Sequence, residues 1–331
     1  MEFLLITLPG LANLAFKEVK LRSIDGEIIC DNRIIVRKTS QEQLSQLRTI
    51  ESISRILLIK ELEVITTKNI RSTLREFFRS NVFKSFIEKG LRIKSSVFPR
   101  EAFSRFFLKL IAHRELKRVF GNFKEDKSAE NILRIDLVEN RLIVSVEVIR
   151  DLHKRSYSVI KHPASLNPLI AAAITLALDV SKRDLILDPF TGIGTIPIEA
   201  SIISNCEAIG FDIDRGFVKG SIENSRVAKV DDLTDFFTAD IYKVKISQSF
   251  TKIITDPPRG RRLSVSNIKE LYTRLFELAK ESLLSNGKIG LITPYEGLAL
   301  KIAKDFNFQC TRICRTLQGG MWVSLLCIST S

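Results

Sequence analysis

The second half of the chain alternates short apolar runs with amphipathic stretches, and this rhythm is the strongest constraint on its fold. The runs have the length of buried strands, and the stretches between them have helical periodicity. The expected strands are Leu185–Asp188, Ala208–Asp212, Phe236–Ala239, Ile253–Thr255, Ile289–Thr293, Phe308–Cys314 and Val323–Ile328. The expected helices are Ile193–Ser204, Gly216–Ala228, Ile268–Leu284 and Gly297–Asp305. Strand–helix repeats build a parallel sheet, and the last two strands lack a helix between them. We therefore predict an α/β fold of five parallel strands closed by an antiparallel hairpin.

The first half reads as a separate α+β region. Its expected strands are Phe3–Leu8, Ile34–Val36, Ile56–Lys60 and Leu142–Val148, and its expected helices follow Pro9-Gly10 and cover Ile70–Phe86 and Phe103–Phe120. In the last helix, Phe103, Phe106 and Phe107 belong to an apolar stripe that predicts a core face rather than a base-stacking surface. We place the domain boundary between residues 155 and 156, so that the domains cover residues 1–155 and 156–331.

The basic charge is concentrated in the first half. The formal net charge is +13. Residues 1–160 hold 30 Lys and Arg against 20 Asp and Glu, an excess of 10, whereas residues 161–331 hold 21 against 18, an excess of 3. This excess favours a polyanionic partner, with nucleic acid ahead of a membrane surface. A solvated basic surface is the alternative.

Several other classes of protein are disfavoured. No apolar run reaches the roughly 20 residues that cross a bilayer, and the N-terminus lacks the pattern of a secretory signal, so a cytoplasmic protein is expected. The five cysteines include no C-x-x-C pair, and the three histidines do not have metal-ligand spacing. We predict no disulfide and no metal, and we read Cys310 and Cys314 as strand residues.

A glycine turn follows the first predicted strand of the second half. After Asp188 the chain reads Pro-Phe-Thr-Gly-Ile-Gly-Thr, where Gly192 and Gly194 let a ligand approach the backbone at a helix start. The turn is neither a dinucleotide fingerprint nor a phosphate-binding loop. Asp188 would repel a pyrophosphate but suit a cation. Because the ammonium and sulfonium groups of S-adenosylmethionine are cationic, this cofactor is favoured over a dinucleotide.

Two further acids end the next predicted strands. Asp212 closes Ile209-Gly210-Phe211-Asp212, where a carboxylate can accept hydrogen bonds from both ribose hydroxyls. Asp240 ends the third strand and is placed to bind the adenine amino group. Each acid alone has an ordinary reading as a capping residue, but three at successive strand ends point to one ligand site.

The segment Asp256-Pro257-Pro258-Arg259-Gly260 follows the fourth predicted strand and suits chemistry on a planar amine. The lone pair of such a nitrogen is delocalised into its ring. The Asp256 carboxylate and the Pro257 carbonyl can accept its two N–H groups and direct the lone pair toward a methyl group. The prolines stiffen the loop. Positioning and proton acceptance are the expected sources of rate. A rigid turn without chemistry is the plain alternative.

These motifs resemble those of the THUMP-domain RNA guanosine-N2 methyltransferases, most nearly the archaeal-type enzymes acting at position 6 of tRNA, with the position 10 enzymes second. The resemblance rests on Asp188–Thr195 with Glu199-Ala200, Asp256-Pro257-Pro258-x-Gly260, Leu152–Arg155, His162–Pro168, Leu8–Leu11 with Lys17–Val19, and Gly319–Met321. It implies a C-terminal class I, Rossmann-like, seven-stranded methyltransferase domain. It also implies an N-terminal ferredoxin-like segment and a THUMP domain that bind the tRNA acceptor stem. We expect a monomer.

The resemblance and the basic residues define candidate sites. The candidate catalytic residues are Asp256, Pro257, Pro258, Arg259 and Gly260. The candidate S-adenosylmethionine residues are Ser165, Leu166, Asp188, Phe190, Thr191, Gly192, Gly194, Thr195, Asp212, Ile213, Asp240 and Ile241. The candidate RNA contacts are Arg92, Lys94, Arg105, Arg114, Lys117, Arg118, Lys154, Arg155, Arg261 and Arg262.

The chain departs from the family at Arg259, where members usually carry a ring that stacks on the target base. A guanidinium plane can also stack on a base, or it can bind a phosphate. Three alternatives stay open: a DNA adenine or cytosine amino-methyltransferase, an rRNA amino-methyltransferase, and an inactive RNA-binding subunit with a methyltransferase fold. A protein-glutamine methyltransferase is disfavoured because it would prefer Asn-Pro-Pro-Tyr.

Overall fold

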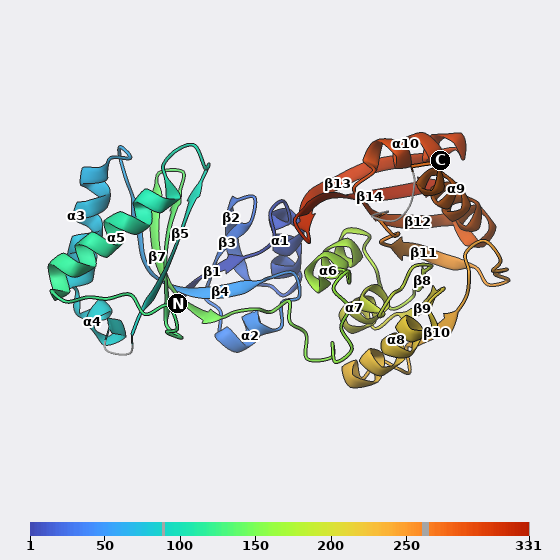
Figure 1. Ribbon diagram of the computed structural model, residues 1–331, viewed down its shortest axis with the longest axis horizontal. Helices are drawn as coiled ribbons and strands as arrows, with labels where there is room; N and C mark the ends of the chain where they lie inside the picture. The colour runs from blue at the N-terminus through green and yellow to red at the C-terminus, as the bar shows by residue number, and fades with distance from the viewer. Residues whose placement is uncertain (88–89, 260–264, 331) are drawn as a thin grey trace. The chain divides into compact units, whose positions relative to one another are not determined.

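The computed structural model describes residues 1–87, 90–259 and 265–330 of the chain. These residues form two compact units (Figure 1). The first comprises Met1–Thr7 and Val19–Asp151, and the second comprises Leu8–Glu18 and Leu152–Ser331. The division differs from the expected boundary in two respects: the chain changes unit after Asp151, and the early segment Leu8–Glu18 belongs to the second unit.

The described strands of the first unit form one seven-stranded sheet. Its strands are β1 (Glu2–Ile6), β2 (Asp25–Cys30), β3 (Arg33–Arg37), β4 (Ser52–Glu61), β5 (Arg92–Phe98), β6 (Ile132–Val138) and β7 (Arg141–Ile149). Their order is β2-β3-β1-β4-β7-β6-β5, with only β5 and β6 paired in parallel among these neighbours. Its helices are α2 (Gln41–Ser45), α3 (Thr67–Arg79), α4 (Asn81–Ile87) and α5 (Arg105–Phe120), and α1 (Ala12–Leu21) begins in the second unit and ends in the first.

Two expectations for this unit are wrong. The helix expected over Ile70–Phe86 is two helices, because Ser80 adopts an extended backbone between α3 and α4 and lets Phe83 pack beside Phe78. Phe106 belongs to the apolar stripe that predicts a core face, but its side chain is 78% exposed. The buried face of α5 is instead built on Leu108, Ile111, Ala112, Glu115 and Leu116.

The sequence reading also missed β5 and β6, because charged residues interrupt their apolar pattern. In β6, Arg134 and Asp136 are buried together, and Arg134 also binds Glu147 of β7 at 2.9 Å. Arg33 of β3 reaches Asp136 at 3.4 Å. Burying a charge is tolerable when it is paired and hydrogen-bonded in this way.

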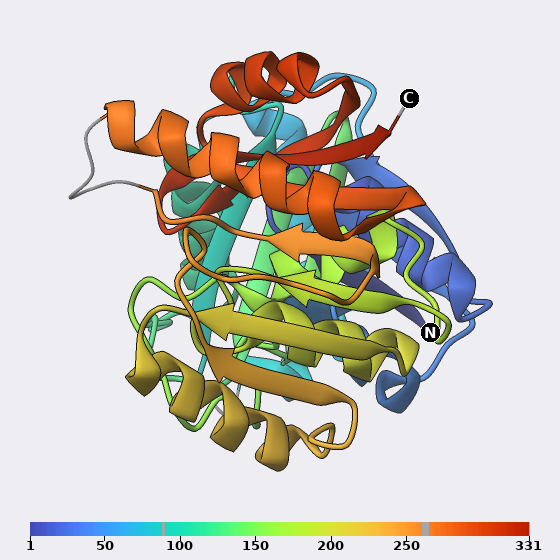
Figure 2. The same ribbon diagram turned by 90° about the vertical axis from the view of Figure 1, so that its right-hand side faces the viewer.

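The second unit is built on another seven-stranded sheet. Its strands are β8 (Leu185–Asp188), β9 (Glu207–Asp212), β10 (Thr234–Thr238), β11 (Phe250–Thr255), β12 (Leu283–Thr293), β13 (Phe308–Gln318) and β14 (Met321–Thr330). The order is β10-β9-β8-β11-β12-β14-β13, with β14 antiparallel to both neighbours and the other neighbouring strands parallel. The arrowheads of β8, β9 and β11 therefore point to one edge, the left edge in Figure 2. The α/β fold with a seven-stranded C-terminal sheet is confirmed.

Helices cover both faces of this sheet. They are α6 (Pro168–Ala177), α7 (Thr195–Ser204), α8 (Arg215–Ala228), α9 (Val265–Ser282) and α10 (Glu296–Asp305). One core joins α9 and α10 to the sheet, and another joins α6 and α7 to its other face. The sequence reading missed α6, because this helix is apolar on all sides and so lacks an amphipathic period.

The first turns of α1 belong to the second core. Leu11 is fully buried and Leu14 nearly so, and both join the cluster that contains Ile170 and Ile174 of α6. Lys17 adds a hydrogen bond to the Leu176 carbonyl at 2.7 Å. Residues near the N-terminus thus help to stabilise the C-terminal fold.

We predict that Leu11→Ala destabilises the second unit by roughly 2–5 kcal/mol, because it removes buried side-chain volume from that core. Thermal unfolding should show a lower midpoint for the transition that shifts when S-adenosylmethionine is added. Leu21→Ala is the matched control, since Leu21 is the last residue of α1, the helix that follows Leu11, and is exposed. Equal effects of the two substitutions would contradict this assignment of the segment.

Candidate active site

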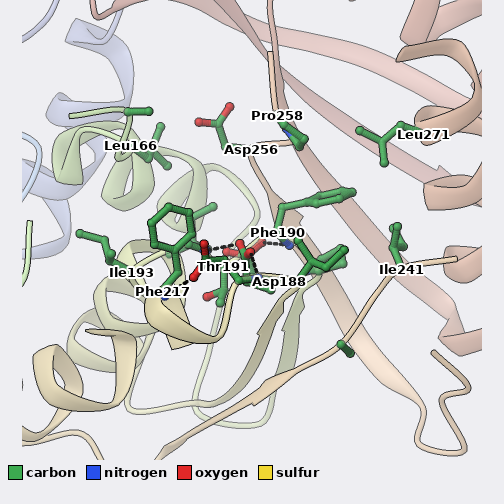
Figure 3. A pocket seen from close by; sticks show the side chains of 18 of the residues that line it. Leu166, Asp188, Phe190, Thr191, Ile193, Phe217, Ile241, Asp256, Pro258 and Leu271 are labelled. Atoms are coloured by element: carbon green, nitrogen blue, oxygen red, sulfur yellow. Dashed lines mark hydrogen bonds between the residues drawn. The ribbon is translucent and has the colours of Figure 1, made fainter. Parts of the chain in front are cut away.

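A cavity of about 800 Å³ opens at the carboxyl edge of the second sheet (Figure 3). Its walls come from the ends of β8, β9, β10 and β11, from the loop before α6 and from the start of α9. Of the candidate cofactor residues, Ser165, Leu166, Asp188, Phe190, Thr191, Gly192, Thr195, Asp212, Ile213, Asp240 and Ile241 line it. Of the candidate catalytic residues, Asp256 and Pro258 line it. The structure therefore brings the two predicted sites together.

The described lining of the cavity is acidic. It includes six carboxylate side chains and no lysine or arginine. The six are Asp188, Asp212, Asp214, Asp240, Asp256 and Glu270. Opposite charges attract strongly where protein walls exclude water. A cavity of this size and sign fits a cationic nucleoside better than an anionic dinucleotide.

Asp188 lies at the base of the cavity and is almost completely buried. Its Oδ1 accepts hydrogen bonds from the Thr255 hydroxyl at 2.7 Å and from the Phe190 N–H at 3.2 Å. Burial nevertheless raises its pKa to about 7, and the charges of Asp256 and Asp212 act in the same direction. A bound cation would favour the ionised form of this carboxyl.

Asp212 is fixed by backbone groups. Its Oδ2 accepts the Gly192 N–H, and its Oδ1 accepts the Asp214 N–H, each at 3.0 Å. The carboxylate thus joins the glycine turn to the start of α8. Asp240 is held similarly by the Tyr242 N–H at 3.0 Å.

Gly194 does not line the cavity, although it was a candidate cofactor residue. It is the N-cap of α7 and has a positive φ of 84°. A Cβ at this position would lie 2.7 Å from the Cβ of Ser221. Gly194 therefore sets the turn and the packing of α7 rather than contributing to the wall.

Several lining residues were missed by the sequence reading. They are His162, Ala164, Pro189, Ile193, Ile196, Asp214, Phe217, Ala239, Tyr242, Asn267, Glu270 and Leu271. His162 packs edge-on against Phe217, with ring centroids 4.8 Å apart. The signal for His162 was present, since it begins the segment His162–Pro168 that carries part of the family resemblance. The contributions of α8 and α9 depend on helix packing and have no local sequence signal.

Asp256 is engaged by Arg259. The Nη2 of Arg259 lies 2.8 Å from Oδ1 and 2.7 Å from Oδ2 of Asp256. Both carboxylate oxygens of Asp256 are therefore occupied by the guanidinium of Arg259. Burial raises the pKa of Asp256, whereas the charge and hydrogen bonds of Arg259 oppose that rise.

The backbone of the Asp256 loop is anchored from β12. The Tyr295 hydroxyl donates to the Arg259 carbonyl at 2.8 Å, and the Tyr295 N–H donates to the Thr293 hydroxyl. Pro257 is buried beside Asp256 and lies outside the cavity lining. Gly260, Arg261 and Arg262 lie outside the described residues, so their predicted roles are not tested.

Most of the candidate RNA contacts within the described residues are exposed. Arg92, Arg105, Arg114, Lys117, Arg118 and Lys154 are exposed. Lys94 is half-buried and binds Glu147 at 3.0 Å.

The prediction for Arg155 is wrong. Its side chain is buried against Glu199 of α7 at 2.9 Å, and the Tyr157 hydroxyl donates to the same carboxylate at 2.8 Å. Arg155 therefore compensates the charge of a buried acid and is not available to bind RNA.

The structure offers no other obvious cofactor centre in the part of the chain that it describes. No group of three or more metal-ligating side chains is found there, and the five cysteines are unpaired. None of the described helices is both long and apolar enough to cross a membrane.

Comparison with known proteins agrees with the fold. A family model for an RMKL-like, methyltransferase domain matches residues 155–324, which is more than half of the chain. The tRNA (guanine(6)-N2)-methyltransferase of Archaeoglobus fulgidus is 26% identical over 96% of this chain and 89% of that protein. The tRNA (guanine(10)-N2)-dimethyltransferase of Methanothermobacter thermautotrophicus is 29% identical over 60% of this chain and 65% of its own length. TrmN from Thermus thermophilus has a similar structure, with a TM-score of 0.83, 19% identity and coverage of 100% of this chain and 99% of that chain.

A seven-stranded mixed sheet with this strand order, and an acidic cavity at the carboxyl edge of its parallel strands, is typical of a class I methyltransferase domain. The chain belongs to the family of RMKL-like methyltransferase domains. It is an S-adenosylmethionine-dependent methyltransferase, and the acidic lining fits that cationic cofactor. The family, the enzyme class and the cofactor predicted from sequence are confirmed.

We predict that S-adenosylmethionine binds more tightly as the pH rises through about 7, because the pKa of Asp188 is raised to about 7 and the cation requires its ionised form. Below that pH, binding must first drive a proton from the carboxyl. Calorimetric titration on either side of this pH should show the trend in the native protein. Asp188→Asn should lose the part of the pH dependence that comes from this group. The same slope in both proteins would show that Asp188 does not face the cation.

Proposed function

We propose that this protein transfers a methyl group from S-adenosylmethionine to the exocyclic N2 amine of a guanosine in tRNA. The observation that carries the proposal is Asp256-Pro257-Pro258 at the rim of an acidic cofactor cavity. The relatives named above support guanine in tRNA as the substrate. Position 6 is favoured because that relative matches 96% of this chain, and position 10 is second.

The proposed cofactor residues would each bind a different part of S-adenosylmethionine. Asp212 and Asp240 are assigned to the ribose hydroxyls and the adenine amino group, and Asp188 to the positively charged end. The apolar side chains of Phe190, Ile213 and Ile241 would cover the adenine ring. When bound, S-adenosylmethionine supplies an electrophilic methyl group on a sulfonium.

Asp256 and the Pro257 carbonyl would hold the amine of the target guanine. Two acceptors fix the two N–H groups and direct the nitrogen lone pair toward the methyl group, which is a positioning effect. The buried carboxylate then accepts the proton that the methylated amine must release. Its partial burial keeps competing water away from the reacting nitrogen.

Arg259 must release Asp256 before an amine can occupy the same acceptors. In the structure the guanidinium uses both carboxylate oxygens. A phosphate of bound RNA is a natural alternative partner for a guanidinium. We therefore propose that the guanidinium of Arg259 keeps the Asp256 carboxylate paired and ionised until RNA binds.

The first unit is proposed to bind the acceptor stem. It carries five of the exposed basic candidates, which are Arg92, Arg105, Arg114, Lys117 and Arg118. A guanine in a paired stem must leave the helix before it can react, at a cost of a few kcal/mol. Contacts to phosphates elsewhere on the RNA would supply that free energy.

We predict that Asp256→Ala reduces methyl transfer to unmodified tRNA by at least about 100-fold while cofactor affinity stays near that of the native protein. Transfer is measured with radiolabelled cofactor, and affinity by calorimetry. The product nucleoside, identified by mass spectrometry, should be N2-methylguanosine. Methyladenosine or methylcytidine would contradict the proposed substrate. Lost cofactor binding in the variant would instead make Asp256 a structural residue.

We predict that Arg259→Leu shifts the acidic limb of the pH–rate profile to higher pH. Burial raises the pKa of Asp256, and Arg259 opposes that rise, so removing the guanidinium leaves a carboxyl that ionises only at higher pH. The measurement is the pH profile of kcat/KM for the tRNA transcript at saturating cofactor, because it reports the RNA-free enzyme in which Arg259 binds Asp256. Arg259→Lys keeps the charge and should move the limb less. An identical limb in all three proteins would exclude the proposed coupling.

The rival function is an RNA-binding subunit whose methyltransferase unit is inactive. The pairing of Arg259 with Asp256 is the observation that favours it, since the acceptor is occupied. Native protein that binds tRNA and cofactor but transfers no methyl group to any RNA would support this rival.

A further inference from the structure

The end of the β13–β14 hairpin lies at the edge of the sheet that carries Asp256. Thr255 pairs with Leu291 of β12, and Thr293 of the same strand pairs with Ser324 of β14. Trp322 lies two residues beyond Ser324. Because β14 runs antiparallel to β12, this places Trp322 past the carboxyl end of β12.

The strand alternation also fixes the face on which Trp322 lies. Side chains two residues apart share a face of a strand. Leu326 packs into the core with α9 and α10, and the Ser324 hydroxyl donates to Glu296 at the start of α10 at 2.7 Å. The side chain of Trp322 therefore lies on the same face of β14 as those of Leu326 and Ser324, beyond the start of α10. It is therefore on the side of the sheet from which Tyr295 reaches the Asp256 loop.

Trp322 and Arg315 form an exposed aromatic and cationic pair. Trp322 is the one tryptophan of the chain and is 48% exposed. The guanidinium carbon of Arg315 lies 5.9 Å from the centre of its ring. Arg312 is the residue that forms an ion pair with Glu296, at 3.2 Å, whereas the charge of Arg315 acts on Glu296 without an ion pair between them in the part of the chain that the structure describes. A half-exposed indole beside an exposed guanidinium matches a nucleobase beside its phosphate.

This pair is held firmly in relation to the cofactor cavity. The buried Gln318 side chain accepts the Asn167 N–H at 3.0 Å and donates to the Ser165 carbonyl at 2.9 Å. Ser165 lines the cavity. A hairpin fixed in this way presents its aromatic side chain at a defined place on the sheet edge that carries Asp256.

We propose that Trp322 stacks on an RNA base next to the target nucleotide while Arg315 binds an adjacent phosphate. The proposal rests on the proposed RNA methyl transfer and adds a contact within the second unit. When a base leaves its helix, the neighbouring bases lose a stacking partner, and stacking on an indole compensates part of that loss. Trp322 is thus a substrate-positioning residue at the proposed site.

The first test uses substitutions. Trp322→Leu should raise the KM for an unmodified tRNA transcript about tenfold or more, with cofactor affinity unchanged. Trp322→Phe, which keeps an aromatic face, should retain most of the affinity. Phe237→Leu is the matched control, because Phe237 is an exposed aromatic residue on β10 at the opposite edge of the same sheet. A KM in Trp322→Leu equal to that of the native protein would overturn the proposal.

The second test uses the fluorescence of the same residue. Because the chain has one tryptophan, its emission reports on this position alone. Saturation with the tRNA transcript should quench the emission of Trp322. Binding of the RNA is measured separately by the anisotropy of labelled RNA. In that measurement, Arg315→Gln should bind the RNA more weakly. Bound RNA with unchanged emission would overturn the proposal.

These two measurements distinguish the proposed stacking on Trp322 from the proposed methyl transfer. Quenching without methyl transfer in the native protein would leave the stacking contact intact and reject the proposed function. Normal methyl transfer with an unchanged KM in Trp322→Leu would reject the contact and leave the function intact.

Discussion

In a parallel sheet the carboxyl ends of the strands lie at one edge, and the cofactor cavity depends on this constraint. Here β8, β9, β10 and β11 deliver carboxylates to the same small volume. The hydrogen bonds to Asp188 do not fully offset its burial, as its raised pKa shows. A positively charged ligand stabilises an acidic cavity whose described lining holds no lysine or arginine, which links the fold directly to the chemistry of the cofactor.

The Asp256 loop shows the opposite balance. Asp256 has its own cation, Arg259, which binds both oxygens of the carboxylate. The charge and hydrogen bonds of Arg259 oppose the rise in the pKa of Asp256 that burial causes. Tyr295 binds the backbone carbonyl of Arg259, so the backbone and the guanidinium of this residue have separate partners.

Much of the second unit could be predicted because its signals are local. Short apolar runs bounded by turns located every strand of its sheet, and Asp188, Asp212 and Asp240 stood at strand ends. Where the pattern was not periodic, prediction failed. The helix α6 is apolar on all sides, and β6 carries buried charges that resemble a surface pattern. The stripe of α5 included Phe106, whose exposure depends on how the helix is rotated against its neighbours.

The sequence by itself determined where the strands of the second unit lie along the chain, the glycine turn and the acids that end the strands, because each depends on residues close together in the chain. Only the tertiary structure decided the partners of the charged side chains. Arg155 was predicted to bind RNA and instead pairs with Glu199, which is 44 residues away. Likewise, Leu11 joins the core of α6 from the far end of the chain. Such pairings depend on packing between distant segments, and no local periodicity encodes them.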